Sequence, residues 1–300
     1  MKCAIGKYCL VSALAVLYMH NACALEGGAS SYPLGVVTVM SGAMGAPGDT
    51  MFYTYNKLID ISSIRDNGGD KTFPKARGKI HAHALRVVHT LDGVEFLGGN
   101  VSLQAAASYI FGHMDIPSLG PFGRDSSYGT GDPLFGAIVN WQSPTYMQSV
   151  ELDFIVPWGT YHKGELVNAG NNAKAWYATY SFTWFPTQQL ELSSKISVNY
   201  SFENPSTHYT SGVQLAADYG VNYHVTQNWL VGVGGYVTTQ LNDDKSDDEK
   251  VGNRTRNIKI GPQVGYAHKD WGVVAAYQYD VYARNTAASN IFMLNGFFKF

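Results

Sequence analysis

Apolar and polar residues alternate through the stretch Leu190–Phe202, which reads LELSSKISVNYSF. Its even-numbered residues are apolar except Ser194, and its odd-numbered residues are polar and carry charges of both signs. Because strand side chains point alternately to two faces, the pattern predicts a β-strand with one apolar and one polar face. The stretch is longer than the roughly five or six residues of most soluble strands, and its length suits a tilted strand that crosses a membrane.

The same alternation recurs along the chain in about twelve segments, and Trp and Tyr are frequent near their ends, as in the aromatic girdles of membrane barrels. The expected strands are Met51–Ile64, Ile80–Leu91, Asn100–Gly112, Gly131–Gln142, Tyr146–Trp158, Trp176–Phe185, Leu190–Phe202, Gly212–Val225, Trp229–Leu241, Arg256–Ala267, Trp271–Arg284 and Asn290–Phe300.

The links between these segments alternate between short and long. Residues 143–145 and 226–228 form short links, and residues 92–99 form another shorter link with an expected turn at Asp92-Gly93. Residues 113–130 and 242–255 form long links. Tight turns at one end and long loops at the other are typical of a barrel whose strands run up and down. We therefore predict an all-β fold: an antiparallel, up-and-down transmembrane β-barrel of about twelve strands, with short periplasmic turns and long outer loops.

The first residues have the features of a secretory signal peptide. Lys2 and Lys7 precede the apolar run Tyr8–Met19, which is too short to span a bilayer as a helix, and a small-x-small site follows at residues 22–24. This predicts a signal peptide over residues 1–24, with acylation of Cys23 as the alternative. Export with cleavage would remove all three cysteines, and with them any disulfide, thiol nucleophile or cysteine metal site.

The next segment, residues 25–50, is rich in Gly, Ala and Ser and lacks the alternation. We interpret it as an N-terminal extension, which either plugs the lumen or hangs in the periplasm, before a barrel over residues 51–300. Without the signal peptide the chain has 19 basic and 23 acidic residues. This mildly acidic balance gives no reason to expect nucleic acid as a partner.

The chain ends in Phe300, after a segment whose alternate residues are apolar. Such an ending resembles the C-terminal signal that the barrel assembly machinery reads in outer-membrane proteins. An edge strand of a soluble β-sandwich could end in the same way, but the signal peptide and the alternation favour the outer membrane of a Gram-negative cell, surrounded by lipid.

Charged residues on the polar faces are the candidate site, because those faces would line the lumen. The interior could be a salt-bridged structural network, or it could form a narrow pathway of mixed polarity for small, partly apolar solutes. The candidates are Glu151, Asp153, Glu191, Lys195, Asp218, Lys259, Asp280 and Arg284, and we expect Lys57 and Arg86 to join them.

Other patterns point only weakly to chemistry. His81 and His83 form an H-x-H pair, and His89 lies on the same expected strand. We interpret these histidines as facing the lumen rather than binding a metal. The acidic run 242–250 lacks the spacing of a calcium loop, and the glycines at 232–235 precede no expected helix. No G-x-S-x-G motif occurs. We therefore expect no catalytic residue, metal or cofactor, and no enzyme activity.

Short motifs in a consistent order resemble a known family, the "MetA-pathway of phenol degradation" family of SphA-like outer-membrane transporters. The resemblance implies a membrane component of aromatic catabolism rather than a ring-cleaving enzyme, and it supplies no site residues. Val156-Pro157-Trp158-Gly159 departs from the family's more usual Pro-Thr-Gly. The matching stretches are Glu26-Gly27-Gly28, Ser31-Tyr32, Gly45-Ala46-Pro47-Gly48, Gly129-Thr130-Gly131-Asp132-Pro133, Asn168-Ala169-Gly170-Asn171-Asn172, Thr207-His208-Tyr209-Thr210-Ser211-Gly212, Asp218-Tyr219, Asp243-Asp244, Gly252-Asn253-Arg254 and Gly261-Pro262.

These observations support three hypotheses about function. The first is a channel that takes up small aromatic or other hydrophobic compounds. The second is a non-specific porin for small solutes, and the third is a barrel enzyme that hydrolyses lipids at the outer leaflet.

Overall fold

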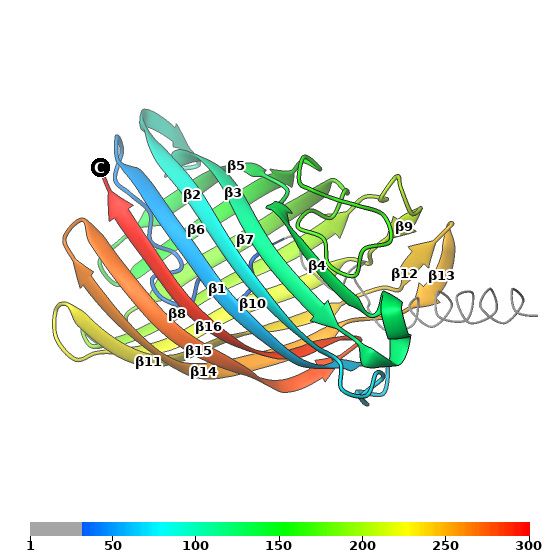
Figure 1. The fold of residues 1–300 in the computed structure, drawn as a ribbon. Helices are drawn as coiled ribbons and strands as arrows, with labels where there is room; N and C mark the ends of the chain where they lie inside the picture. Colours follow the sequence, from blue (N-terminus) through cyan, green and yellow to red (C-terminus); the bar gives the residue numbers. More distant parts are fainter. Residues whose placement is uncertain (1–31) are drawn as a thin grey trace, which may run out of the picture.

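The structure is a computed structural model, which describes residues 32–300. Twelve antiparallel strands form a closed barrel (Figure 1), so the predicted fold class is confirmed. The expected signal peptide lies outside the described residues. No helix among residues 32–300 is long and apolar enough to cross a membrane. The barrel strands are β1 (Thr50–Arg65), β2 (Arg77–Phe96), β3 (Gly99–Asp115), β5 (Leu134–Gln142), β6 (Tyr146–Ile155), β7 (Ala175–Trp184), β8 (Leu190–Ser201), β10 (Gln214–His224), β11 (Trp229–Gln240), β14 (Arg256–His268), β15 (Trp271–Arg284) and β16 (Thr286–Lys299).

Each strand pairs with its neighbour along the barrel wall, and the last strand closes the ring against the first. β16 pairs with β1 from Met51 opposite Lys299 to Arg65 opposite Thr286. Short turns join the strands at the end that also holds Thr50 and Phe300, which we call the periplasmic end. The long loops lie at the other end, called the outer end (Figure 1).

The loops of the outer end contain structure that the sequence did not indicate. The expected loop 113–130 holds a 3-10 helix, η2 (Pro117–Phe122), and a strand, β4 (Arg124–Thr130), which pairs with the outer half of β3. A small separate sheet joins β9 (Tyr209–Thr210), β12 (Asp244–Ser246) and β13 (Glu249–Gly252). These strands are too short for the alternation of residues to reveal them.

The strand β2 is longer than expected, because its turn lies elsewhere. The sequence places the turn at Asp92-Gly93, but the strand continues beyond a register shift and turns at Leu97-Gly98. Both residues of that turn have positive φ, 50° and 73°, which fits the tight turns favoured between antiparallel strands.

The two faces of most strands follow the predicted alternation. In β8, Glu191 and Lys195 are buried, whereas Ile196, Val198 and Tyr200 are exposed. A soluble protein would bury the apolar face, so this inverted pattern is typical of strands that meet lipid outside and enclose a polar lumen.

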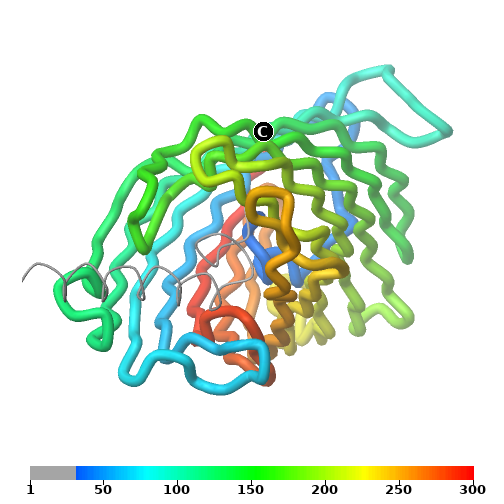
Figure 2. The backbone as a smooth tube through the Cα atoms, turned by 90° about the vertical axis from the view of Figure 1, so that its right-hand side faces the viewer, coloured from blue at the N-terminus to red at the C-terminus, as the bar shows by residue number. Residues whose placement is uncertain are grey.

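The chain before β1 lies inside this lumen. Figure 2, seen from the outer end, shows the first described residues as a blue segment within the ring of strands. Leu34 and Val36 pack in a cluster with Tyr236 and Ile291 of the barrel wall. We call residues 32–49 the lumenal segment.

Candidate functional site

The middle of the lumenal segment is held through its backbone by polar side chains of the wall. Asp218 accepts hydrogen bonds from the backbone N–H groups of Gly35, at 2.7 Å, and of Val37, at 3.2 Å. These bonds satisfy peptide groups that would otherwise be buried without partners. Side chains that donate to its carbonyl groups come from Lys57 (to Leu34, 2.8 Å), Gln278 (to Gly35, 3.0 Å), Asn295 (to Val36, 3.0 Å) and Asn222 (to Thr38, 3.1 Å).

The segment then descends along β8 to the periplasmic end. Glu191 accepts a hydrogen bond of 2.8 Å from the Met40 N–H, and its other carboxylate oxygen lies 2.8 Å from His224 Nε2. The segment ends where Asp49 forms an ion pair of 3.3 Å with Lys299, the last residue of β16.

One wall glycine shows how closely the segment is packed. A Cβ atom added to Gly220 would lie 1.8 Å from the Thr38 carbonyl oxygen. Only glycine therefore lets the segment lie against β10 in this way.

A buried cluster of charged groups lies beside the start of the segment. Lys195 Nζ is 2.9 Å from Glu151 Oε2, and Arg86 Nη2 is 3.5 Å from the same oxygen. Gln104 donates to both Glu151 and Asp153. Lys195 Nζ also lies 4.9 Å from the centroid of the Tyr32 ring, which joins the cluster to the segment by a cation–π contact.

A second charged group lies on the opposite run of strands. Lys259 forms an ion pair of 2.7 Å with Asp280 Oδ2 and also donates to Ser289 of β16. Asn257 donates to the other oxygen of Asp280 at 2.5 Å. The two groups thus occur as paired, hydrogen-bonded charges rather than as a row of one sign.

The structure places the predicted lumen residues in three settings. Glu151, Asp153 and Lys195 form one cluster, Lys259 and Asp280 form the other, and Glu191 and Asp218 hold the lumenal segment. Arg284 is separate from these groups: it lies at the outer end of β15, where its guanidinium donates to Asn67 of the β1–β2 loop. The two residues that we expected to join them, Lys57 and Arg86, are both buried inside.

The expected position of the histidines on β2 is wrong. His81, His83 and His89 are exposed on the outer face, because Ile80, Ala82 and Ala84 take the inward positions. His83 Nδ1 lies 2.8 Å from Asn56 Oδ1 of β1 on that outer face. This part of the wall therefore has the opposite polarity from β8.

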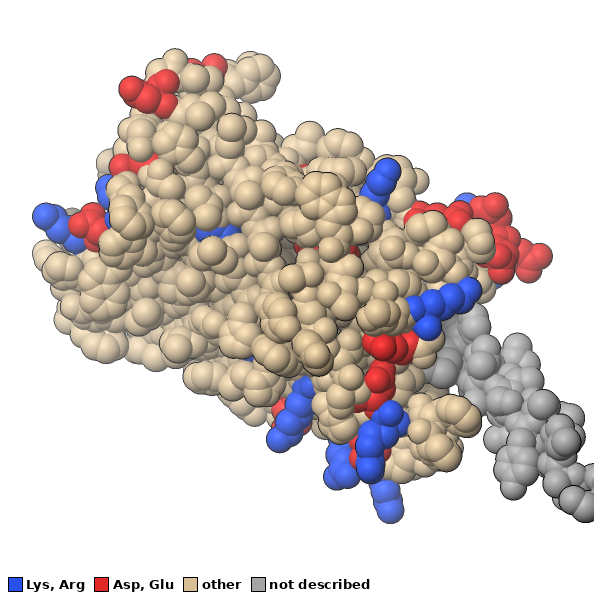
Figure 3. All heavy atoms as spheres, turned by 45° about the horizontal axis from the view of Figure 1, so that its top comes forward, with Lys and Arg blue, Asp and Glu red and all other residues tan. Residues whose placement is uncertain are grey.

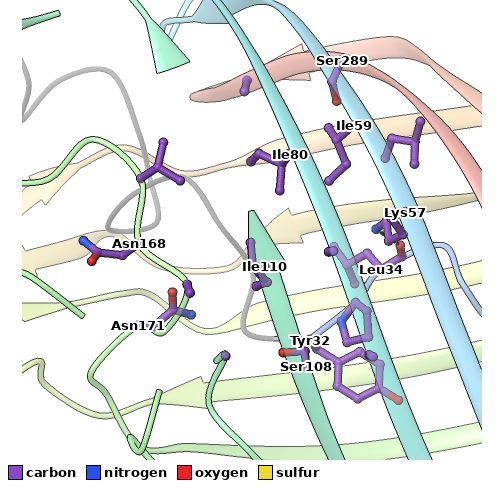
Figure 4. Close-up of a pocket in the computed structure, with 18 of the residues that line it drawn as sticks. Tyr32, Leu34, Lys57, Ile59, Ile80, Ser108, Ile110, Asn168, Asn171 and Ser289 are labelled. Atoms are coloured by element: carbon purple, nitrogen blue, oxygen red, sulfur yellow. Dashed lines mark hydrogen bonds between the residues drawn. The ribbon is translucent and has the colours of Figure 1, made fainter. Parts of the chain in front are cut away.

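A cavity of about 440 Å³ lies against the inner side of β1, β2 and β3, between the lumenal segment and the outer loops (Figure 4). Its wall is mostly aliphatic, and Figure 4 shows Ile59, Ile80 and Ile110 pointing into it. Polar groups of Ser108, Asn168 and Asn171 lie at one side. These apolar residues were not predicted to face the lumen, although they alternate with the polar residues Asn56, Asp60, His81 and His83, which indicates inverted polarity.

The outer loops that cover the cavity are fixed by two carboxylates. Asp132 accepts hydrogen bonds from the backbone N–H groups of Gly159, at 2.8 Å, and Asn171, at 2.7 Å. Asp125 of β4 accepts two from the backbone of Leu166 and Val167. β3 pairs with β5 only as far as Ala106, and from Tyr109 onwards it pairs with β4 instead. The loop 156–174 therefore packs beside β4, beyond the end of the β3–β5 pairing.

The small outer sheet is built around Asp244. Its carboxylate accepts hydrogen bonds from the Gly212 N–H, at 2.7 Å, from the Tyr209 hydroxyl and from Gln240. Burial raises the pKa of Asp244 to about 7, against the effect of these donors. Among residues 32–300, no group of three or more His, Cys, Asp or Glu side chains is arranged to hold a metal ion.

The fold and the polarity of the faces define an outer-membrane β-barrel that holds residues 32–49 of its own chain inside the lumen. The chain matches the model of the family described as "Putative MetA-pathway of phenol degradation" over residues 61–295, and it therefore belongs to this family. No curated protein matches the chain by sequence.

Solved structures share the fold. The COG4313 outer membrane channel from Pseudomonas putida F1 aligns with a TM-score of 0.74 and 14% identity, over 86% of this chain and 98% of that chain. The CymD monoaromatic hydrocarbon channel aligns with a TM-score of 0.45 and 9% identity, over 89% and 97% of the two chains. At these identities the first comparison shows a common fold, and the second carries no further conclusion.

Proposed function

We propose that the protein is an outer-membrane channel that admits small aromatic or other hydrophobic solutes. The observation that supports this most directly is the cavity of about 440 Å³ with mostly aliphatic walls, inside a barrel that buries many polar and charged side chains elsewhere. A cavity of about 150 Å³ can hold benzene, so this volume suffices for one or two aromatic rings. The family name, which refers to phenol degradation, supports the same class of solute.

Uptake into lipid vesicles tests the proposal. Vesicles that contain the purified protein should accumulate phenol or toluene faster than empty vesicles. Ala84→Trp places a ring into the cavity and should abolish the difference, because Ala84 lines it. Leu85→Trp adds the same ring one residue further on, at an exposed position of β2, and should leave uptake unchanged. Equal uptake by vesicles with and without protein, for every aromatic probe, would refute the proposal.

A non-specific porin is the alternative, and single-channel recording distinguishes the two. The lumenal segment lies inside the barrel from Tyr32 to the periplasmic end, and if it obstructs the lumen we expect low or intermittent conductance. Large, steady conductance steps from the intact protein would favour the porin.

Lipid hydrolysis receives little support from the geometry. His113 Nδ1 lies 2.7 Å from Ser126 Oγ near the outer end, but these two residues are direct neighbours across β3 and β4. Within the described residues, no carboxylate is hydrogen-bonded to His113 to complete a triad. We therefore propose a channel without enzyme activity, and release of fatty acid that Ser126→Ala abolishes would show otherwise.

A further inference from the structure

The outward face of β2, β3 and β4 carries polar and aromatic residues in ordered rows near the outer end. These strands pair directly, so residues opposite one another form rows across the face. From the outer end inwards, the rows are Arg77–Asp115–Arg124, then Lys79–His113–Ser126, then His81–Phe111–Tyr128. The charged groups therefore lie nearer the outer end than the aromatic groups, on a face that continues into the lipid-facing wall.

The distance of these rows from the periplasmic end, measured along the membrane normal, can be estimated from the length of β2. His89 lies at the periplasmic end, where its ring is 3.0 Å from the Thr50 hydroxyl. Lys79 is ten residues further along the strand. In a strand tilted by about 40° this corresponds to roughly 25 Å, which is about the thickness of the apolar band around such barrels. Lys79 and Arg77 thus reach the level of the outer-leaflet head groups.

The arginines retain free hydrogen-bonding capacity. Arg77 and Arg124 lie 3.1 Å and 3.5 Å from Asp115, yet their side chains are 74% and 72% exposed. A guanidinium group has five N–H donors, so a single shared carboxylate leaves most of them available. Asp60 lies opposite Lys79 on β1, and it is the other carboxylate of this surface.

The rest of the lipid-facing wall provides a contrast. The exposed residues on the outer faces of β5 to β11 are uncharged, and they include Phe135, Leu152, Trp176, Val198 and Val231. Figure 3 shows basic side chains at the lower right with acidic ones among them, apart from the acidic β12–β13 hairpin at the right. The outward faces of β2 to β4 thus carry charges that those of β5 to β11 lack.

We propose that this surface, made by Arg77, Lys79, Arg124, His81 and His113, binds the phosphate groups of lipid A in the outer leaflet. Arg binds phosphate through paired N–H donors, and Lys provides a further charge at the same height. The acyl chains below the phosphates would lie on the aromatic row of Phe111 and Tyr128, which are 48% and 70% exposed. Cations above exposed aromatic rings, at head-group height, match an anionic lipid better than a protein partner.

Native mass spectrometry of the full-length protein tests this proposal. The protein is released from vesicles of phosphatidylethanolamine that contain either diphosphoryl lipid A or lipid A without phosphate, and the lipid that stays bound is counted. We expect the wild type to retain the diphosphoryl form at least tenfold more strongly. The triple variant R77Q/K79Q/R124Q should lose this preference. The matched control K245Q/K250Q/K269Q removes three exposed lysines elsewhere and should keep it.

Each outcome decides the proposal. Loss of the preference in the first variant alone supports a phosphate site on this surface. Equal losses in both triple variants, or no loss in either, overturn it, because binding would then depend on total charge or on another surface. If the first variant does not fold, R77K/R124K is used instead, because it keeps both charges but removes the paired N–H donors. A weaker preference for diphosphoryl lipid A than in the wild type then supports the proposal, and an unchanged preference overturns it. A wild type that retains both lipids equally refutes the proposal.

Discussion

The wall from β6 to β11 and the outer part of the wall from β1 to β3 have opposite polarity. The first buries Glu151, Lys195 and Asp218 and exposes aliphatic and aromatic residues. The second turns Ile59 and Ile80 inwards and exposes Asp60 and His81. One barrel thus contains a polar region beside β6 to β10, and an apolar cavity beside the outer part of β1 to β3. The difference shows that the alternation of residues fixes the faces of a strand, but not which face is the inner one.

The largest expected effect comes from breaking the charged cluster of the polar wall. Glu151→Gln leaves Lys195 and Arg86 buried without their shared carboxylate. Loss of one partner from a buried ion pair costs about 3–5 kcal/mol. Urea unfolding in vesicles, followed by Trp fluorescence, measures the loss. Glu249→Gln, at an exposed position of β13, is the control, and equal midpoints for the two variants would mean that the cluster contributes nothing.

A lysine on the outside should distinguish the two walls directly. Ile196→Lys places a charge midway along the lipid face of β8 and should cost about 2–4 kcal/mol. His81→Lys introduces the same side chain near the outer end of β2, where the cost falls to about 0–1 kcal/mol. The same unfolding assay applies. Equal costs would show that the outer face of β2 is embedded as deeply as that of β8.

The attachment of the lumenal segment should depend on the inner carboxylate of β10. Asp218→Asn replaces an acceptor of two N–H groups with a group that also donates, and it should cost about 1–3 kcal/mol of local stability. Hydrogen exchange at the Gly35 and Val37 amides should accelerate. Asp60→Asn, on the outer face of β1, is the matched control and should leave both amides protected. Unchanged exchange in Asp218→Asn would contradict this role.

The most local effect is expected in the outer sheet, which belongs to neither wall. The pKa of Asp244 is raised to about 7, so the folded sheet holds its proton more tightly than the unfolded chain. The stability of the sheet should therefore fall as the pH rises from about 4 to about 7, and remain level above that. Hydrogen exchange of the Gly212 amide, corrected for its intrinsic pH dependence, measures this. Asp244→Asn should remove the dependence, whereas Asp243→Asn should keep it.

Most of the barrel could be predicted from the sequence, because ten or more residues of alternation are enough to identify a long strand. Glu191, Lys195 and Asp218 were placed inside for the same reason. The cavity could not be predicted in this way. Its floor is the lumenal segment, which has no alternation, and the segment's position depends on contacts such as Gly35 with Asp218, which are 183 residues apart.

The outer sheet escaped prediction for a similar reason. From the residues, Asp244 belongs to an acidic run and to a stretch that matches the family, but in the structure it contacts Tyr209, 35 residues earlier. Its neighbours in sequence give no sign that it is buried. Short strands such as β9, with two residues, are defined only by such distant partners.

The closure of the barrel around the lumenal segment constrains the order of assembly. The segment is hydrogen-bonded to β10, β15 and β16. The barrel is closed only when the last strand, β16, pairs with the first strand, β1. Once β16 has paired with β1, the barrel surrounds residues 32–49. Insertion of this segment into a closed barrel, between side chains that already pack against one another, would be slow. We therefore expect the segment to be enclosed during biogenesis, as an internal template on which the last strands fold, rather than to enter a finished pore.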